Sequence, residues 1–240
     1  MGVSNRQVVK GLFAISLLWL LSFSAQAQLS LGFRSGISVS SFRVTPDAIN
    51  IREIGGWEFA VPVEIRLNEW IALQPELGFS QRGVNYTRGS SLDGNRGFLS
   101  ALSGRVSLNY LQTPFLIKFA PESYRAFSFQ AFAGPSLGIL LNARSEESFG
   151  LQSEDPPVTR TLDSGLAGGE IKNFDIGVVI GSGIAYRIRG RNLSKRYRGE
   201  ILMDVRYTIG TTHLDPNWNP GNVSNRSLAI TWGYRVDLGR

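Results

Sequence analysis

The residues most able to do chemistry are few, and the first is a serine between glycines. The segment Gly134-Pro135-Ser136-Leu137-Gly138 matches G-x-S-x-G, the pattern in which a strained turn presents a serine nucleophile. That arrangement needs a strand, a sharp turn and then a helix. Strand-like apolar sequence instead continues directly beyond Gly138. We therefore favour a structural role in which Ser136 faces the interior of a β-protein, with a nucleophile as the alternative.

A second candidate is His213, the single histidine of the chain, which lies beside Asp215 in a long connection. Its imidazole could act as a general base if a serine and a carboxylate lay within hydrogen-bond reach. A solvated loop histidine is the alternative that we favour. One histidine and no cysteine leave only scattered carboxylates for a metal ion. Gly181-Ser182-Gly183 lacks the third glycine and the helix of a dinucleotide site. We expect no catalytic, cofactor-binding or metal-binding residues.

The cluster of like charge that stands out is basic and surrounds a turn at 187–198. It consists of Arg187, Arg189, Arg191, Lys195, Arg196 and Arg198. Such a turn could contact anionic lipid headgroups or an acidic protein partner, whereas an ordinary solvated turn is the alternative that we favour. The formal net charge of the whole chain is +6 and is spread along it. We therefore expect no nucleic-acid binding.

Residues 1–27 have the three parts of a secretory signal peptide. A basic start with Arg6 and Lys10 precedes an apolar run at 12–23 and small residues at a cleavage site. The apolar run is too short to span roughly 30 Å of hydrocarbon as an anchor. We expect the signal peptide to be removed and residues 28–240 to form one domain outside the cytoplasm.

Most of the remaining sequence alternates between apolar residues and polar or small ones, which indicates β-strands. The alternation is clearest at 57–67, 71–80, 201–209 and 228–238, and is also present at 29–42, 103–120, 127–142 and 174–188. Long connections fall at about 43–56, 87–102, 143–173 and 211–226, and shorter ones at about 68–69, 121–125 and 190–198. Even strand numbers, short turns on one side and long extracellular loops on the other are typical of bacterial outer-membrane barrels. The predicted fold is all-β: an eight-stranded antiparallel up-and-down transmembrane β-barrel, preceded by a cleaved signal peptide.

The second face of each strand decides between a membrane barrel and a soluble, lipocalin-like periplasmic barrel that binds a ligand. A soluble barrel would show water a face rich in Lys and Glu, but here this face is poor in Lys and rich in small residues. Small residues with paired charges suit the narrow interior of eight strands. The expected interior charges are Glu58, Glu64, Glu76, Asp204 and Asp237 with Arg66, Arg105, Arg206 and Arg235. We predict that they plug the lumen, that the apolar face contacts lipid, and that Trp57 and Trp70 belong to aromatic girdles.

Prolines within the expected strands conflict with a closed barrel, because proline cannot donate a ladder hydrogen bond. They are Pro62, Pro75, Pro114 and Pro135. We expect β-bulges to accommodate them. Around Pro114 the apolar positions change from even to odd numbers, which favours a bulge there.

Several stretches of the chain, in this order, resemble the PorT-family outer-membrane β-barrel proteins. They are residues 110–119 (YLQTPFLIKF), 133–138 (AGPSLG), 174–177 (FDIG), 181–183 (GSG), 206–210 (RYTIG), and 225–228 (NRSL) leading into 233–234 (GY). The last strand departs from the usual assembly signal, since it ends in aliphatic residues and Gly239-Arg240 where an aromatic residue is expected. The resemblance implies an integral protein of the cell outer membrane in contact with its lipid. The founding member is linked to protein secretion across that membrane.

Together these features favour a non-enzymatic barrel with a structural or interaction role, which the resemblance extends to assistance in secretion. A protein partner would bind through the long extracellular loops or the basic turn 187–198. The first alternative is an outer-membrane enzyme that modifies lipid and uses His213. The second is the soluble ligand-binding barrel.

Overall fold

The structure is a computed structural model of the chain that describes residues 28–44, 50–89, 101–121, 126–149, 158–161, 173–188, 199–212 and 223–238. Its strands are β1 (Gln28–Val44), β2 (Asn50–Arg66), β3 (Ile71–Gly89), β4 (Ala101–Phe119), β5 (Phe127–Phe149), β6 (Val158–Thr161), β7 (Phe174–Ile188), β8 (Gly199–Gly210) and β9 (Val223–Asp237). The expected signal peptide, residues 1–27, lies outside the described residues. Within the described ranges, no helix is long and apolar enough to cross a membrane.

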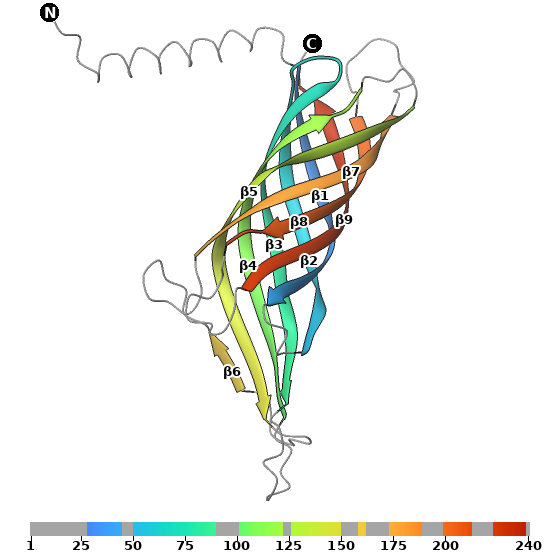
Figure 1. Ribbon diagram of the computed structural model, residues 1–240. Coiled ribbons are helices and arrows are strands. Elements are labelled where there is room, and N and C mark those ends of the chain that lie inside the picture. The colour runs from blue at the N-terminus through green and yellow to red at the C-terminus, as the bar shows by residue number, and fades with distance from the viewer. Residues whose placement is uncertain are drawn as a thin grey trace, which may run out of the picture.

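Eight of these strands close into one antiparallel barrel that follows the order of the chain (Figure 1). Each strand pairs with the next, β5 pairs with β7, and β1 pairs with β9 from Ser30↔Asp237 to Val44↔Val223. This last pairing closes the wall. The short β6 lies outside the ring and pairs with the far end of β5. The predicted eight-stranded up-and-down barrel is confirmed.

On the side of the long connections, several strands continue beyond the closed wall. Pairing of β1 with β2 ends at Ser40↔Ile54, whereas β2 pairs with β3 as far as Asn50↔Thr87. Pairing of β5 with β7 ends at Ile139↔Phe174, yet β5 continues to Phe149. We call the sheet formed by these ends of β2, β3, β4 and β5, together with β6, the projecting sheet; it occupies the lower part of Figure 1.

The projecting sheet corrects the predicted extent of three long loops. Residues 50–56, 87–89, 101–102, 143–149 and 158–161 are strand, although they were expected to be parts of loops. Beyond the apolar wall, neither face of a strand needs to be apolar. The sequence there therefore lacks the apolar/polar alternation that predicts strands.

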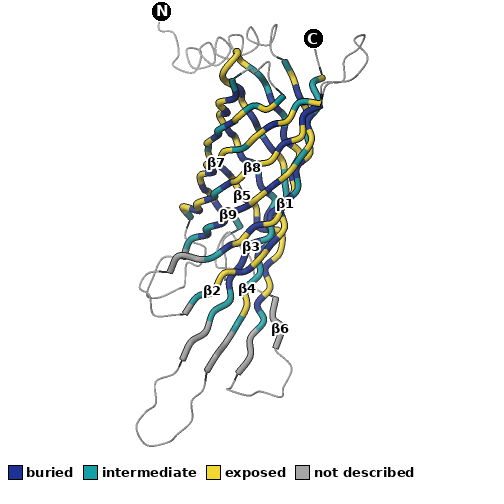
Figure 2. The backbone as a smooth tube through the Cα atoms, turned by 90° about the vertical axis from the view of Figure 1, so that its right-hand side faces the viewer, coloured by how far each residue is buried: buried dark blue, intermediate teal, exposed yellow. Residues whose placement is uncertain are grey.

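Side chains alternate between the lumen and the outer surface, and the outer set is apolar. Along β7, exposed and buried residues alternate from Phe174 to Ile180, and Figure 2 shows the same alternation along the other strands. Phe59 and Ile230 are 48% and 41% exposed, while Val63 and Tyr207 are partly exposed and also lie on the outer face.

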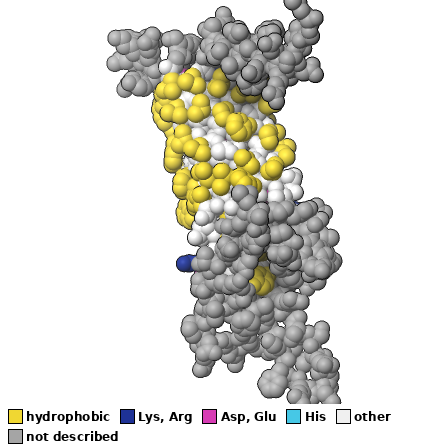
Figure 3. Space-filling view, turned by 90° about the vertical axis from the view of Figure 1, so that its left-hand side faces the viewer, with side chains coloured by type: hydrophobic (Ala, Val, Ile, Leu, Met, Phe, Trp, Pro, Cys, Tyr) yellow, Lys and Arg dark blue, Asp and Glu magenta, His cyan; other side chains and the backbone are white. Residues whose placement is uncertain are grey.

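The outer surface is therefore apolar where a soluble barrel would be charged. Figure 3 shows apolar side chains over the described part of one face, with a cationic side chain at the lower margin of this band. On β2 the outward apolar residues run from Trp57 to beyond Ile65, which matches the roughly 9–11 residues of a tilted membrane-spanning strand. Soluble monomeric proteins rarely expose a contiguous apolar surface of this extent to water. The soluble-barrel alternative is wrong.

Aromatic side chains gather at the end of the wall opposite the projecting sheet. Trp70, in the turn between β2 and β3, is 54% exposed and stacks on Phe119 with ring centroids 5.8 Å apart. Phe127 contacts Tyr186 with centroids 4.9 Å apart. Trp57 is 59% exposed nearer the other end of β2. These positions agree with aromatic girdles at both margins of a membrane-spanning wall.

The prolines do not shift the strand register. The β3–β4 pairing keeps one register from Ile71↔Phe119 to Gly89↔Ala101, across Pro75 and Pro114. The β1–β2 pairing keeps its register from Leu31↔Val63 to Arg34↔Ala60, past Pro62. The predicted bulges at the prolines are therefore wrong, and each proline interrupts the ladder only locally.

The register shifts that the structure shows lie elsewhere. One falls between Glu53 and Glu58 of β2. The other falls at Asn109/Tyr110 of β4, opposite an extra residue of β5 near Leu141-Asn142. The apparent parity change at Pro114 has a different cause: Leu108 and Tyr110 are apolar residues that face the lumen.

Candidate functional site

The lumen of the barrel is filled by charged side chains of both signs. Of the predicted interior charges, Glu58, Glu64, Glu76, Asp204, Arg206 and Arg235 are buried. Arg66 and Asp237 are half-buried, and the carboxylate of Asp237 accepts a hydrogen bond from Ser30 Oγ at 2.7 Å. Arg105 is exposed, so its placement in the interior was wrong. Odd positions of β4 face outward, and Arg105 is one of them.

Glu76 on β3 is the centre of one layer of this interior. Its Oε2 accepts hydrogen bonds from Arg34 Nε at 3.0 Å, Arg34 Nη2 at 2.7 Å and Arg206 Nη1 at 2.9 Å. Its Oε1 accepts from Arg206 Nη2 at 3.0 Å and from Gln74 Nε2 at 2.6 Å. The Arg206 guanidinium also lies 4.6 Å from the ring centre of Phe132, a cation–π contact. Buried charge is tolerated only when paired and hydrogen-bonded, and both carboxylate oxygens of Glu76 meet that condition.

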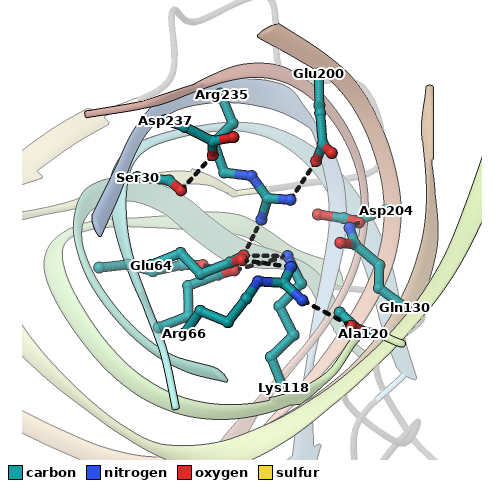
Figure 4. A network of polar contacts seen from close by, with 12 residues as sticks. Ser30, Glu64, Arg66, Lys118, Ala120, Gln130, Glu200, Asp204, Arg235 and Asp237 are labelled. Atoms are coloured by element: carbon teal, nitrogen blue, oxygen red, sulfur yellow. Dashed lines mark hydrogen bonds and ion pairs between the residues drawn. The ribbon is translucent and has the colours of Figure 1, made fainter. Parts of the chain in front are cut away.

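Glu64 on β2 is the centre of a second layer, nearer the short turns (Figure 4). Its carboxylate accepts hydrogen bonds from Lys118 Nζ at 2.8 Å and from Arg66 Nη2 at 3.2 Å. Arg235 donates to Glu64 and to Glu200, and so joins β9 to β2 and β8. One carboxylate thus holds three cations from three other positions in the wall.

A third layer lies toward the projecting sheet. Arg82 Nη1 donates to Asp175 Oδ2 at 3.1 Å, and Asn225 Nδ2 donates to the same oxygen at 2.9 Å. The Arg82 guanidinium lies 5.6 Å from the ring centre of Tyr110. The side chain of Leu108, which lies opposite Arg82 in the β3–β4 pairing, is buried and apolar. Polar layers with some apolar side chains between them therefore occupy the described part of the lumen.

Several members of these layers were not predicted. Arg82 and Glu200 were missed because the expected strands ended at 80 and began at 201, one or two residues short of them. Arg34 and Lys118 lie inside expected strands on the polar face. The period-2 alternation alone was the signal that would have found them.

The sequence also offered a serine, a histidine beside a carboxylate, and a basic turn as candidate functional residues. Ser136 is 4% exposed on the lumen side of the unbroken strand β5, which lacks the turn and helix of a nucleophile elbow. His213 and Asp215 lie outside the described residues. Of the basic cluster, Arg187 is described, and its Nη2 lies 3.0 Å from Glu200 Oε1 at the short-turn end of the lumen. Residues 189–198 lie outside the described part of the chain.

Comparison with known proteins adds a family and distant structural likenesses. The profile of the family described as "Outer membrane protein beta-barrel domain" matches residues 24–215. The chain is similar to the neisserial surface protein NspA, with 10% identity, coverage of 87% of this chain and 97% of that chain, and a TM-score of 0.40.

Two further solved structures are similar at the same level. Ail, the attachment invasion locus protein of Yersinia pestis, is 11% identical, with coverage of 87% of this chain and 99% of that chain and a TM-score of 0.38. OprG of Pseudomonas aeruginosa is 9% identical, with coverage of 89% of this chain and 98% of that chain and a TM-score of 0.41. No curated protein matches the sequence.

Proposed function

This chain belongs to the outer membrane protein beta-barrel domain family and is located in the outer membrane, and on that premise we propose that it is a closed, non-enzymatic barrel that acts by interaction. In this proposal the membrane-spanning wall is an anchor with a plugged lumen. The interaction takes place on the loop side, where the projecting sheet extends beyond the membrane.

The observation that carries the proposal is the pairing of Arg206 with Glu76 across the lumen. Their strands, β8 and β3, are the same number of strands apart in either direction round the ring, so the pair bridges opposite walls. Arg34 reaches the same carboxylate from β1. Eight strands enclose a space that side chains can just fill, and these fill it with bonded charge.

Conductance of single barrels in a planar lipid bilayer tests the closed lumen. We expect the wild-type protein to give no stable conductance steps above the bare bilayer. A variant carrying Arg34→Ala and Glu76→Ala shortens two central side chains while leaving the net charge of the lumen unchanged, and we expect it to conduct. Stable, large steps from the wild-type protein would contradict the proposal.

The projecting sheet offers charged groups of both signs to a protein partner. Arg52, Glu53, Arg105 and Arg144 are exposed there, and Arg105 lies opposite Glu146 in the β4–β5 pairing. Long loops of outer-membrane barrels face the cell exterior, so these side chains would meet a partner outside the cell. Arg187, at the start of the basic turn 187–198, pairs with Glu200 at the short-turn end of the lumen.

The resemblance to PorT-family barrels supports the more specific proposal that this interaction assists protein secretion. Deletion of the gene would then lower the amount of secreted protein in the medium and raise it in the periplasm. Complementation with Arg105→Glu/Arg144→Glu would fail to restore secretion, although heat-modifiable migration on a gel would show a folded barrel. An unchanged set of secreted proteins in the deletion strain would contradict a role in secretion.

A further inference from the structure

The outer wall of the barrel carries an apolar groove of about 610 Å³. It crosses β4, β5, β7, β8 and β9, and its lining includes Ile117, Ala133, Ile180, Tyr207 and Leu228. These residues form one continuous cross-strand row, because Ile117 pairs with Ala133, Ala133 with Ile180, Ile180 with Tyr207, and Tyr207 with Leu228. The groove is therefore a feature of the strand register and not of a loop.

The floor of the groove is made by small side chains. Ala131, Ala133 and Ser182 face outward on β5 and β7. Large side chains flank this floor: Ile117 on β4 and Ile180 on β7 lie on either side of Ala133, and Val205 on β8 lies beside Ser182. Since neighbouring outward residues of one strand are about 7 Å apart, a groove two rows wide is matched to one narrow, unbranched chain.

One end of the groove meets a positive charge. Leu228 forms this end, and Arg226 lies two residues away on the same outward face of β9. This is the end nearer the projecting sheet, because Arg226 pairs with Ile209 at the far end of β8 and with Ser41 near the end of β1. Guanidinium groups bind phosphate with two parallel hydrogen bonds.

We propose that the groove binds one acyl chain of a phosphate-bearing lipid of the outer leaflet, whose phosphate pairs with Arg226. The groove lies within the apolar wall that faces hydrocarbon, and its cationic end lies at the margin where a headgroup would sit. A second copy of this chain fits less well. In a two-fold interface the same surface meets itself, so two grooves would face each other and leave both floors uncovered.

Binding of lipid A to the delipidated barrel in mild detergent, followed by native mass spectrometry, tests the proposal. Ala131→Phe/Ala133→Phe fills the floor from positions that already face outward. Val61→Phe is the matched control, since Val61 is 45% exposed on the outer face of β2, away from the groove. We expect wild type and the control to retain lipid A, the groove-filling variant to bind it at least tenfold more weakly, and Arg226→Gln to weaken it severalfold.

Each other result overturns the proposal. Equal binding of lipid A by wild type and the groove-filling variant would remove the groove as the site. Binding of phosphatidylglycerol in preference to lipid A would remove the outer-leaflet source. A dimer that the groove-filling variant abolishes would make a second copy the occupant. Heat-modifiable migration of every variant shows that it is folded, so that weaker binding is not a loss of structure.

Discussion

Arg206 and Glu76 form a two-bond ion pair, with distances of 2.9 and 3.0 Å, from opposite sides of the barrel. Glu76 is at the same time shared with Arg34, so that one carboxylate neutralises two buried guanidinium groups. Taking such charges out of water is costly, and removal of one partner leaves the others uncompensated. The stability of the barrel therefore depends on Glu76 more than on any exposed acidic residue.

Substitution Glu76→Gln should lower the free energy of unfolding by about 3–5 kcal/mol, because it keeps the shape and removes the charge that Arg34 and Arg206 need. Urea titration in lipid vesicles, followed by heat-modifiable migration, measures this change. Glu53→Gln is the control: Glu53 is exposed on β2, and a change within about 0.5 kcal/mol is expected. Equal effects of the two substitutions would show that the central ion pairs do not stabilise the fold.

The pair Arg82–Asp175 joins β3 to β7 at 3.1 Å and should show energetic coupling. Arg82→Met and Asp175→Asn each leave a buried partner unsatisfied, whereas the double variant removes both charges. We expect the double variant to be less destabilised than the sum of the singles, with a coupling of about 0.5–3 kcal/mol. A double-mutant cycle from the same urea titrations gives this value. Strictly additive effects would show that the two side chains act independently.

Gly36 of β1 lies opposite Thr231 of β9. A Cβ added there would lie 2.2 Å from the carbonyl oxygen of Ile230 and 2.6 Å from Thr231 Cα, both backbone atoms that cannot move aside cheaply. Gly36→Ala should therefore destabilise the barrel by roughly 1–3 kcal/mol or prevent closure. At Gly55 an added Cβ has no atom within 4 Å, so Gly55→Ala should fold as wild type does. A loss of folding yield with Gly55→Ala alone would contradict this account.

The alternation of apolar and small residues was sufficient to predict the barrel, because the solvent of each face differs in polarity and the sequence records that difference. Phe59 and Ile230 face outward as the pattern required. The same rule failed at Leu108 and Tyr110, which are apolar yet face the lumen. There the interior holds a ring beside the Arg82 guanidinium, so an interior position does not have to be polar.

The pairing of the interior charges could not be predicted. Arg206 and Glu76 are 130 residues apart in the chain, and their contact depends on the diameter of the closed ring and on the stagger of its strands. The sequence of a single strand determines neither the diameter of the ring nor the stagger of its strands. The ends of the strands were also beyond the pattern, and Arg82 and Glu200 were lost with them.

Hydrocarbon is the solvent of the outward face, and the accessibility of nitroxide spin labels to oxygen and to a water-soluble nickel chelate measures this. The chain has no cysteine, so Phe59→Cys, Ile230→Cys and Glu53→Cys can each be labelled singly in lipid vesicles. Labels at 59 and 230 should collide with oxygen and be shielded from the nickel chelate, whereas the label at 53 should be shielded less and should collide with the chelate. A nickel chelate that relaxes the labels at 59 and 230 as strongly as the label at 53 would contradict it.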